Sequence, residues 1–234
     1  MTHRILVLQH SPGGFLGALE PPLRAAGFDL QTWRTFEDPA PPLHAGEIDG
    51  LIGLGGVMHP DEDLVHPWLA EVRALYRQAV AREIPTLGVC LGAQLLSQAL
   101  GGSAGPLGRL RVGFLPVEFQ AGDDPLFGGL PDTLQPLSWH EYVAIPPPGA
   151  TVLAAADGTP QVIKFAPLAW GVQFHAELAG HVDRWFEAAG DPLRARGVDV
   201  QELIDDLPVM VETWRPYGEV IGARFAKLVA GLPV

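Results

Sequence analysis

The chain has 234 residues and a mass of 25.0 kDa, the size of one large domain or a domain with a small appendage. Its hydrophobic content of 47% allows a sizeable core, and its formal charge of −12 argues against nucleic acids and anionic membranes as partners. No apolar run approaches the roughly 20 residues of a membrane span, and a single cysteine, Cys90, excludes an intramolecular disulfide and fits a cytoplasmic protein.

The first half of the chain alternates apolar β-type runs with helical patterns. We predict buried strands at 5–10, 49–54 and 84–89, because these runs are short and apolar almost throughout. Helical patterns are predicted at 15–26, 68–80 and 91–100. Continuous apolar strands separated by helices indicate parallel βαβ units.

The pattern changes in the second half. Strands with turn signals between them are predicted at 112–119, 134–145, 151–155 and 161–174, and helix from about residue 180 to the end. We see no repeat or interdomain linker. The simplest prediction is one α/β domain over residues 1–234 with a mixed sheet, in which residues 180–234 form a helical C-terminal extension.

The only cysteine lies at a predicted strand-to-helix turn. Gly88 and Gly92 stand two residues before and after Cys90, and glycines there allow a sharp turn and close strand–helix packing. Such a turn places the sulfur at a helix N-terminus, which stabilises a thiolate. The amide of Leu91 would point at an oxyanion. A lone cysteine is ordinarily a small buried hydrophobe, but this context favours a nucleophile.

A nucleophilic cysteine needs a base, and the base usually needs an orienting group. His175 stands at the end of an apolar strand, with Glu177 two positions further on. Residues at i and i+2 of an extended chain share a face, so Glu177 can reach the imidazole. By itself this pair is common and is also compatible with an ordinary strand-end histidine beside a solvated glutamate.

Together the two motifs resemble those of a known family. Gly88-Val-Cys-Leu-Gly-Ala-Gln94 resembles the nucleophile motif of class I, triad-type glutamine amidotransferases, and Gly171-Val-Gln-Phe-His-Ala-Glu177 resembles their histidine motif. The segment 52–56 resembles their oxyanion-loop strand. The helical tail resembles that of stand-alone members similar to the amidotransferase domain of GMP synthase. The resemblance implies a three-layer fold, in which helices flank a mixed, mainly parallel sheet with a flavodoxin-like core.

The resemblance also implies roles for individual residues. Cys90, His175 and Glu177 would be the catalytic triad that cleaves the γ-carboxamide of glutamine or of another γ-glutamyl compound. The amides of Gly56 and Leu91 would bind the oxyanion. Gln94 and the backbone near Gly55 would hold the glutamyl portion. No metal or organic cofactor is implied.

A further strand histidine, His140, would line the site or be a satisfied core residue; both interpretations stay open. Two charged residues depart from the family pattern: Arg111 stands where many members carry Glu, and Glu141 lies in a segment that lacks the usual Asp. Either residue could alter recognition of the glutamyl group. We therefore expect a γ-glutamyl amide as the small-molecule substrate, without restricting it to glutamine.

Three alternatives for the function stay open. The chain is an independent hydrolase or transferase, an ammonia-supplying glutaminase subunit that needs a separate synthetase, or a non-catalytic regulatory module on the same fold. The extra helical tail favours the first alternative, an independent hydrolase or transferase. A regulatory module would be expected to lose a triad residue, and all three are present. Candidate protein partners are a second copy of the chain and a separate synthetase subunit.

Overall fold

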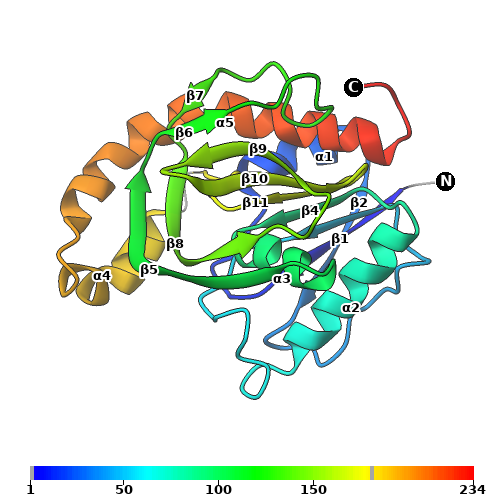
Figure 1. The fold of residues 1–234 in the computed structure, drawn as a ribbon, viewed down its shortest axis with the longest axis horizontal. Coiled ribbons are helices and arrows are strands. Elements are labelled where there is room, and N and C mark those ends of the chain that lie inside the picture. The colour runs from blue at the N-terminus through cyan, green and yellow to red at the C-terminus, as the bar shows by residue number, and fades with distance from the viewer. Residues whose placement is uncertain (1–2, 180–181) are drawn as a thin grey trace.

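The computed structural model describes residues 3–179 and 182–234, and within them the chain builds a nine-stranded sheet and a separate two-stranded ribbon (Figure 1). The order of the large sheet is β2-β1-β3-β4-β11-β10-β9-β6-β7. Its first five strands in this order are parallel neighbours, and the other pairings are antiparallel. The strands are β1 (Arg4–Gln9), β2 (Asp29–Arg34), β3 (Gly50–Gly53), β4 (Thr86–Val89), β6 (Val117–Phe119), β7 (Thr133–Leu134), β9 (Thr151–Ala156), β10 (Thr159–Ala166) and β11 (Ala169–Val172).

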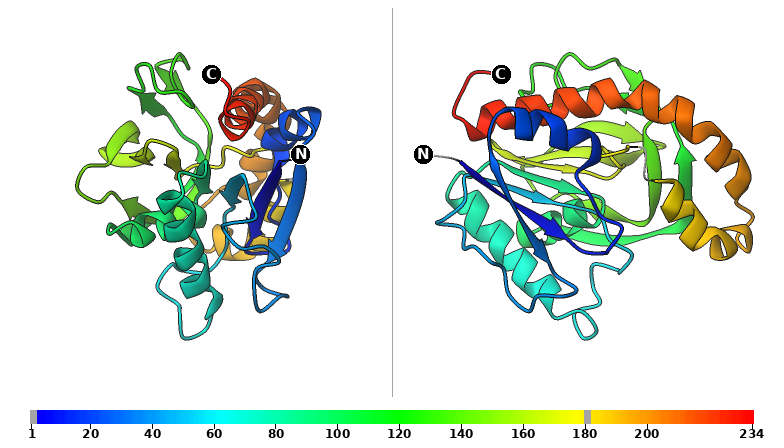
Figure 2. Two further views of the ribbon diagram at one scale, coloured as in Figure 1. Left: turned by 90° about the vertical axis from the view of Figure 1, so that its right-hand side faces the viewer. Right: turned by 180° about the vertical axis from the view of Figure 1, so that it is seen from behind.

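Helices cover both faces of the sheet and make a three-layer structure (Figure 2). One face carries α2 (Trp68–Ala81) and α3 (Leu91–Ala99). The other carries the short 3₁₀ helix η1 (Gly17–Leu19), α1 (Glu20–Ala25) and the long α5 (Val200–Val229). Within residues 3–179 and 182–234, no helix combines the length and apolar character needed to cross a membrane.

Strand β1, which lies between β2 and β3, shows why the sheet needs cover on both sides. Ile5 and Val7 belong to the apolar cluster that includes α5, whereas Leu6 and Leu8 belong to the cluster under α2 and α3. All four are at most 3% exposed. Because successive strand residues point to opposite faces, a strand that is apolar throughout must be buried on both sides.

The remaining elements lie at one end of the sheet and build the surroundings of the site. Strands β5 (Ser103–Phe114) and β8 (Leu137–Ile145) form the antiparallel ribbon, which packs against α3. Ser97 of α3 donates a hydrogen bond to the carbonyl oxygen of Ile145 at 2.5 Å. Helix α4 (Asp183–Arg194) lies near this ribbon (Figure 1).

The predicted α/β class, the mixed sheet and the helices on both faces are confirmed. The sequence patterns missed β2, since of its residues only Trp33 is buried and the strand lies at the sheet edge. The predicted strand 161–174 is two strands, β10 and β11, which pair antiparallel. The predicted helical extension contains α4 and α5, and its first two residues, 180 and 181, lie outside the described part of the chain. The prediction that residues 1–234 form a single domain stays a prediction.

Candidate active site

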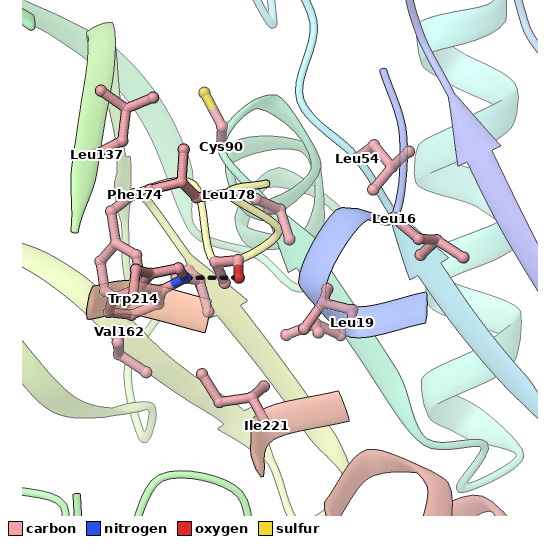
Figure 3. Close-up of a cluster of buried hydrophobic side chains, with 14 of the residues drawn as sticks. Leu16, Leu19, Leu54, Cys90, Leu137, Val162, Phe174, Leu178, Trp214 and Ile221 are labelled. Atoms are coloured by element: carbon pink, nitrogen blue, oxygen red, sulfur yellow. Dashed lines mark hydrogen bonds between the residues drawn. The ribbon is translucent and has the colours of Figure 1, made fainter. Parts of the chain in front are cut away.

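Cys90 occupies a tight turn between β4 and α3. Its φ of +52° lies in the left-handed region that residues other than glycine rarely adopt. The turn depends on its glycines, because a Cβ at Gly88 would lie 2.6 Å from the backbone of Gly92, and a Cβ at Gly92 would overlap the carbonyl oxygen of Gly53. The sulfur points away from the neighbouring apolar cluster (Figure 3) and lies 3.8 Å from the carbonyl oxygen of Trp139.

Sheet register brings the histidine motif to the cysteine. Strand β11 lies parallel beside β4, with Val172 opposite Val89, and the amide of Cys90 donates to the carbonyl oxygen of Val172 at 2.7 Å. The carboxyl ends of both strands therefore meet at the same sheet edge. His175 follows β11 at that edge, and its amide is held at 2.8 Å by the carbonyl oxygen of Leu137 in β8.

His175 and Glu177 form a buried pair. Nδ1 of His175 and Oε1 of Glu177 lie 2.8 Å apart, and the residues are only 6% and 2% exposed. Burial alone would lower the pKa of His175, but the charge and hydrogen bond of Glu177, with a hydrogen bond and negative charge at Cys90, raise this pKa to about 10. The three side chains thus form one interacting group, in which the imidazole is a strong base.

The predicted oxyanion and glutamyl-binding groups also line the cavity around the cysteine. A Cβ at Gly55 would lie 3.2 Å from Cε1 of His175 and 3.4 Å from Cβ of Cys90, so only glycine leaves the backbone free to lie this close. Leu91 is the first residue of α3, where a backbone amide has no partner within the helix. Gln94 donates to the carbonyl oxygen of Tyr142 at 2.8 Å and so braces β8 against α3.

All eight candidate residues line one cavity of about 640 Å³, namely Gly55, Gly56, Cys90, Leu91, Gln94, His140, His175 and Glu177. In the part of the chain that the structure describes, no three or more His, Cys, Asp or Glu side chains gather as a group that could hold a metal ion. The arrangement can therefore supply a nucleophile, a base and an oriented carboxylate to a small molecule bound in this cavity.

His140 lies in the cavity wall beside the base. It is 5% exposed, and neither ring nitrogen has a hydrogen-bond partner among the described residues. Burial, with smaller contributions from the charges of His175 and Arg111, lowers the pKa of His140 to about 3. The ring is thus neutral at ordinary pH, with one nitrogen that can donate and one that can accept a hydrogen bond.

Comparison with known proteins identifies the family. A family model described as "Glutamine amidotransferase class-I" matches residues 13–184. The chain belongs to the class I glutamine amidotransferases. It is accordingly a member of an enzyme family.

Relatives within the class I amidotransferases differ in length. A glutamine amidotransferase-like protein of Salmonella typhimurium, YfeJ, is 30% identical over 65% of this chain and 66% of its own length. A subunit of the glutamine-hydrolysing GMP synthase of Halobacterium salinarum is 33% identical over 76% of this chain and 91% of its own length. The chain spans only 23% of the glutamine-hydrolysing GMP synthase of Thermus thermophilus.

A solved structure matches nearly the whole chain. The crystal structure of a glutamine amidotransferase from Thermotoga maritima is 27% identical, superposes with a TM-score of 0.85, and covers 97% of this chain and 99% of that one. The match therefore includes the helical extension as well as the class I core.

The two residues that depart from the class I pattern have partners in this amidotransferase. Buried Arg111 forms an ion pair with Asp157 at 2.8 Å, and Glu141 forms one with Arg196, which follows α4. Both Glu141 and Arg196 line the cavity, whereas Arg111 does not. Arg111 lies opposite His140 in the β5–β8 ribbon, and its charge contributes to the lowered pKa of His140.

Sequence patterns missed part of this amidotransferase site. Trp185 of the helical extension lines the cavity, with its ring centroid 5.0 Å from that of His175. Its neighbour Phe186 is fully buried, as expected of a packing residue. Trp139 of β8 also lines the cavity. Aromatic residues at helical spacing carry no signal that separates a core position from a cavity wall.

Proposed function

We propose that this class I glutamine amidotransferase hydrolyses a γ-glutamyl amide through a thioester on Cys90, with His175 and Glu177 completing the triad. The observation that carries the proposal is the buried 2.8 Å pair of His175 and Glu177 in the same cavity as Cys90. A strong base beside a thiol at a helix N-terminus is the arrangement that nucleophilic catalysis requires.

The reaction would proceed in two halves. His175 takes the thiol proton, and the sulfur of Cys90 attacks the γ-carbonyl carbon. The resulting oxyanion accepts hydrogen bonds from the amides of Gly56 and Leu91. The carbon–nitrogen bond then breaks, and the imidazolium gives its proton to the departing ammonia or amine. In the second half a water, deprotonated by His175, attacks the thioester. The carbon–sulfur bond breaks, glutamate is released, and the imidazolium returns its proton to the sulfur of Cys90.

Glu177 would act through His175. Its carboxylate accepts the hydrogen at Nδ1 and fixes the tautomer in which Nε2 is free for proton transfer. It also stabilises the imidazolium that forms in each half-reaction. Gly55, Gln94 and His140 would hold the glutamyl portion, His140 through its unpartnered ring nitrogens.

A second candidate is an ammonia-supplying subunit that works with a separate synthetase. The relative named as a subunit of GMP synthase favours it. The two candidates differ in whether the isolated chain turns over. A subunit should be slow by itself and stimulated by its partner, while an independent hydrolase should need no partner.

The test is release of glutamate and of ammonia or amine by the purified chain, with glutamine and a panel of γ-glutamyl amides. Cys90→Ala should abolish release, and a thermal unfolding curve close to that of the wild type shows that the variant is folded. Turnover that persists in Cys90→Ala refutes the mechanism. Absent turnover in a wild-type chain that a glutamine-like electrophile still alkylates at Cys90 favours the synthetase-dependent subunit.

A further inference from the structure

Helix α4 forms a wall of the cavity that holds the triad. Six of its residues line that cavity, namely Arg184 and then Trp185, Ala188, Ala189, Pro192 and Leu193. The last five side chains are apolar or carry a single polar N–H, and only Arg184, which is exposed, is charged. All five lie beyond residue 184, where the match to the family model ends.

The cavity is large for the smallest substrate of the proposed reaction. Its volume of about 640 Å³ lies within the range of roughly 300–1,000 Å³ typical of pockets that enclose drug-sized ligands. Free glutamine, whose leaving group is ammonia, would fill only a fraction of this space. Unfilled apolar surface contributes nothing to binding, whereas an apolar substituent that covered it would add affinity.

The geometry at His175 indicates which part of a substrate would meet α4. The imidazole must give its proton to the departing nitrogen, so that nitrogen lies next to His175. The ring of Trp185 packs edge-on against the same imidazole, at 5.0 Å between centroids and an interplanar angle of 63°. A substituent on the departing nitrogen therefore starts beside Trp185, from which the lining residues of α4 continue along the cavity wall.

The wall beside His175 is held in place by contacts on several sides. The indole Nε1 of Trp185 donates to the carbonyl oxygen of Gly13 at 2.8 Å. Trp139 stacks on Phe186 of α4 at 4.8 Å between centroids. The carbonyl oxygen of Trp139 lies 3.8 Å from the sulfur of Cys90. Aromatic walls on β8 and α4 thus flank the space next to the nucleophile.

Charged groups lie at the rim of this space. Arg196 is paired with Glu141 across the cavity mouth, so the two charges offset each other. Arg184 also lines the cavity and is exposed. The interior next to α4 therefore suits an uncharged substituent.

We infer that the amine portion of the substrate carries a bulky apolar or aromatic group, which binds between Trp139 and the apolar face of α4. This inference rests on the proposed function, because it uses the same nucleophile and base. The substrate class is thus γ-glutamyl amides of large apolar amines, in preference to glutamine itself.

The direct test compares three ligands that share the glutamyl group: glutamine, γ-glutamylmethylamide and γ-glutamyl-(2-phenylethyl)amide. Binding to Cys90→Ala, measured by calorimetry, should be roughly ten- to a hundredfold tighter for the phenylethylamide than for the methylamide. Wild-type kcat/KM should show the same preference. Equal binding and equal kcat/KM for the two amides overturn the inference.

The outcomes separate this inference from the proposed function. Cys90-dependent turnover of all three ligands without preference leaves the proposed function standing and removes the inference. Preferential binding of the phenylethylamide without any turnover supports the apolar pocket and contradicts the proposed hydrolysis.

A charge placed on the wall provides a second test. Ala188 is exposed, and glutamate is a good helix former, so Ala188→Glu should fold. It should lower kcat/KM for the phenylethylamide at least tenfold more than for the methylamide. Ala195→Glu makes the same change at the end of α4 outside the cavity, and its ratio of the two kcat/KM values should match the wild type. An unchanged ratio in Ala188→Glu contradicts the assignment of the pocket to α4.

Discussion

Trp214 connects the C-terminal helix α5 to the loop that carries the candidate base. Its indole Nε1 donates to the carbonyl oxygen of Ala176, between His175 and Glu177, at 3.0 Å (Figure 3). Trp214 is 2% exposed, and its ring packs edge-on against Phe174 at 5.4 Å. Replacing it with phenylalanine would keep an aromatic ring but remove the donor.

The cost of Trp214→Phe follows from these contacts. Leaving a buried carbonyl without its hydrogen-bond donor lowers the free energy of unfolding by about 1–3 kcal/mol. The space left by the smaller ring lowers it by about 1 kcal/mol more. The free energy of unfolding should therefore fall by about 2–4 kcal/mol, which for a chain of this length lowers Tm by roughly 4–16 °C. Because the loosened carbonyl lies between the two residues of the pair, kcat should also fall.

The measurement is urea unfolding of the variant, with steady-state hydrolysis on the same preparation. Trp185→Phe is the matched control for the unfolding measurement alone, because it also removes an indole donor from a backbone carbonyl, that of Gly13, but in a solvent-exposed hydrogen bond that water can replace. Its effect should stay below about 1 kcal/mol. The reasoning would be refuted if the two substitutions lowered the free energy of unfolding equally. It would also be refuted if Trp214→Phe changed that free energy by no more than about 0.5 kcal/mol, as a typical surface substitution does.

Two further predictions concern the titratable groups. Glu177→Gln should lower the pKa of His175, measured by NMR, since burial then outweighs the remaining interactions; it should reduce kcat/KM by less than His175→Ala, which removes an acid–base contribution of roughly 10²–10⁴. An unchanged pKa and rate would show that the carboxylate does not act on the imidazole. Burial also lowers the pKa values of His10 and His140 to about 3, while the unfolded chain binds protons below about pH 6.5. The free energy of unfolding should therefore fall between pH 6.5 and 4 by about 1.4 kcal/mol per pH unit for each. His140→Gln should halve the part of the pH dependence of the unfolding free energy that the two histidines contribute. A pH dependence identical to that of the wild type would contradict the assignment of His140 as a neutral buried group.

Local patterns in the chain were enough to predict the elements around Cys90. The apolar run before it, the flanking Gly88 and Gly92, and the helical pattern after it all lie within a few residues, and the structure has the predicted strand, turn and helix. The pairing of His175 with Glu177 was likewise predicted from their i, i+2 spacing. Such features depend on backbone sterics and periodicity, which neighbouring residues determine.

Only the tertiary structure decided what surrounds these residues. The parallel pairing of β11 with β4 brings His175 to Cys90, and the β5–β8 ribbon places Trp139 and His140 in the cavity. Helix α4 buries Phe186 while its neighbour Trp185 faces the cavity. A helical pattern predicts that one face is apolar, but whether that face meets a core or an open cavity depends on elements distant in the sequence. The candidate nucleophile and the residues proposed to act with it could therefore be selected from the sequence, whereas the shape and apolar character of the pocket required the packed structure.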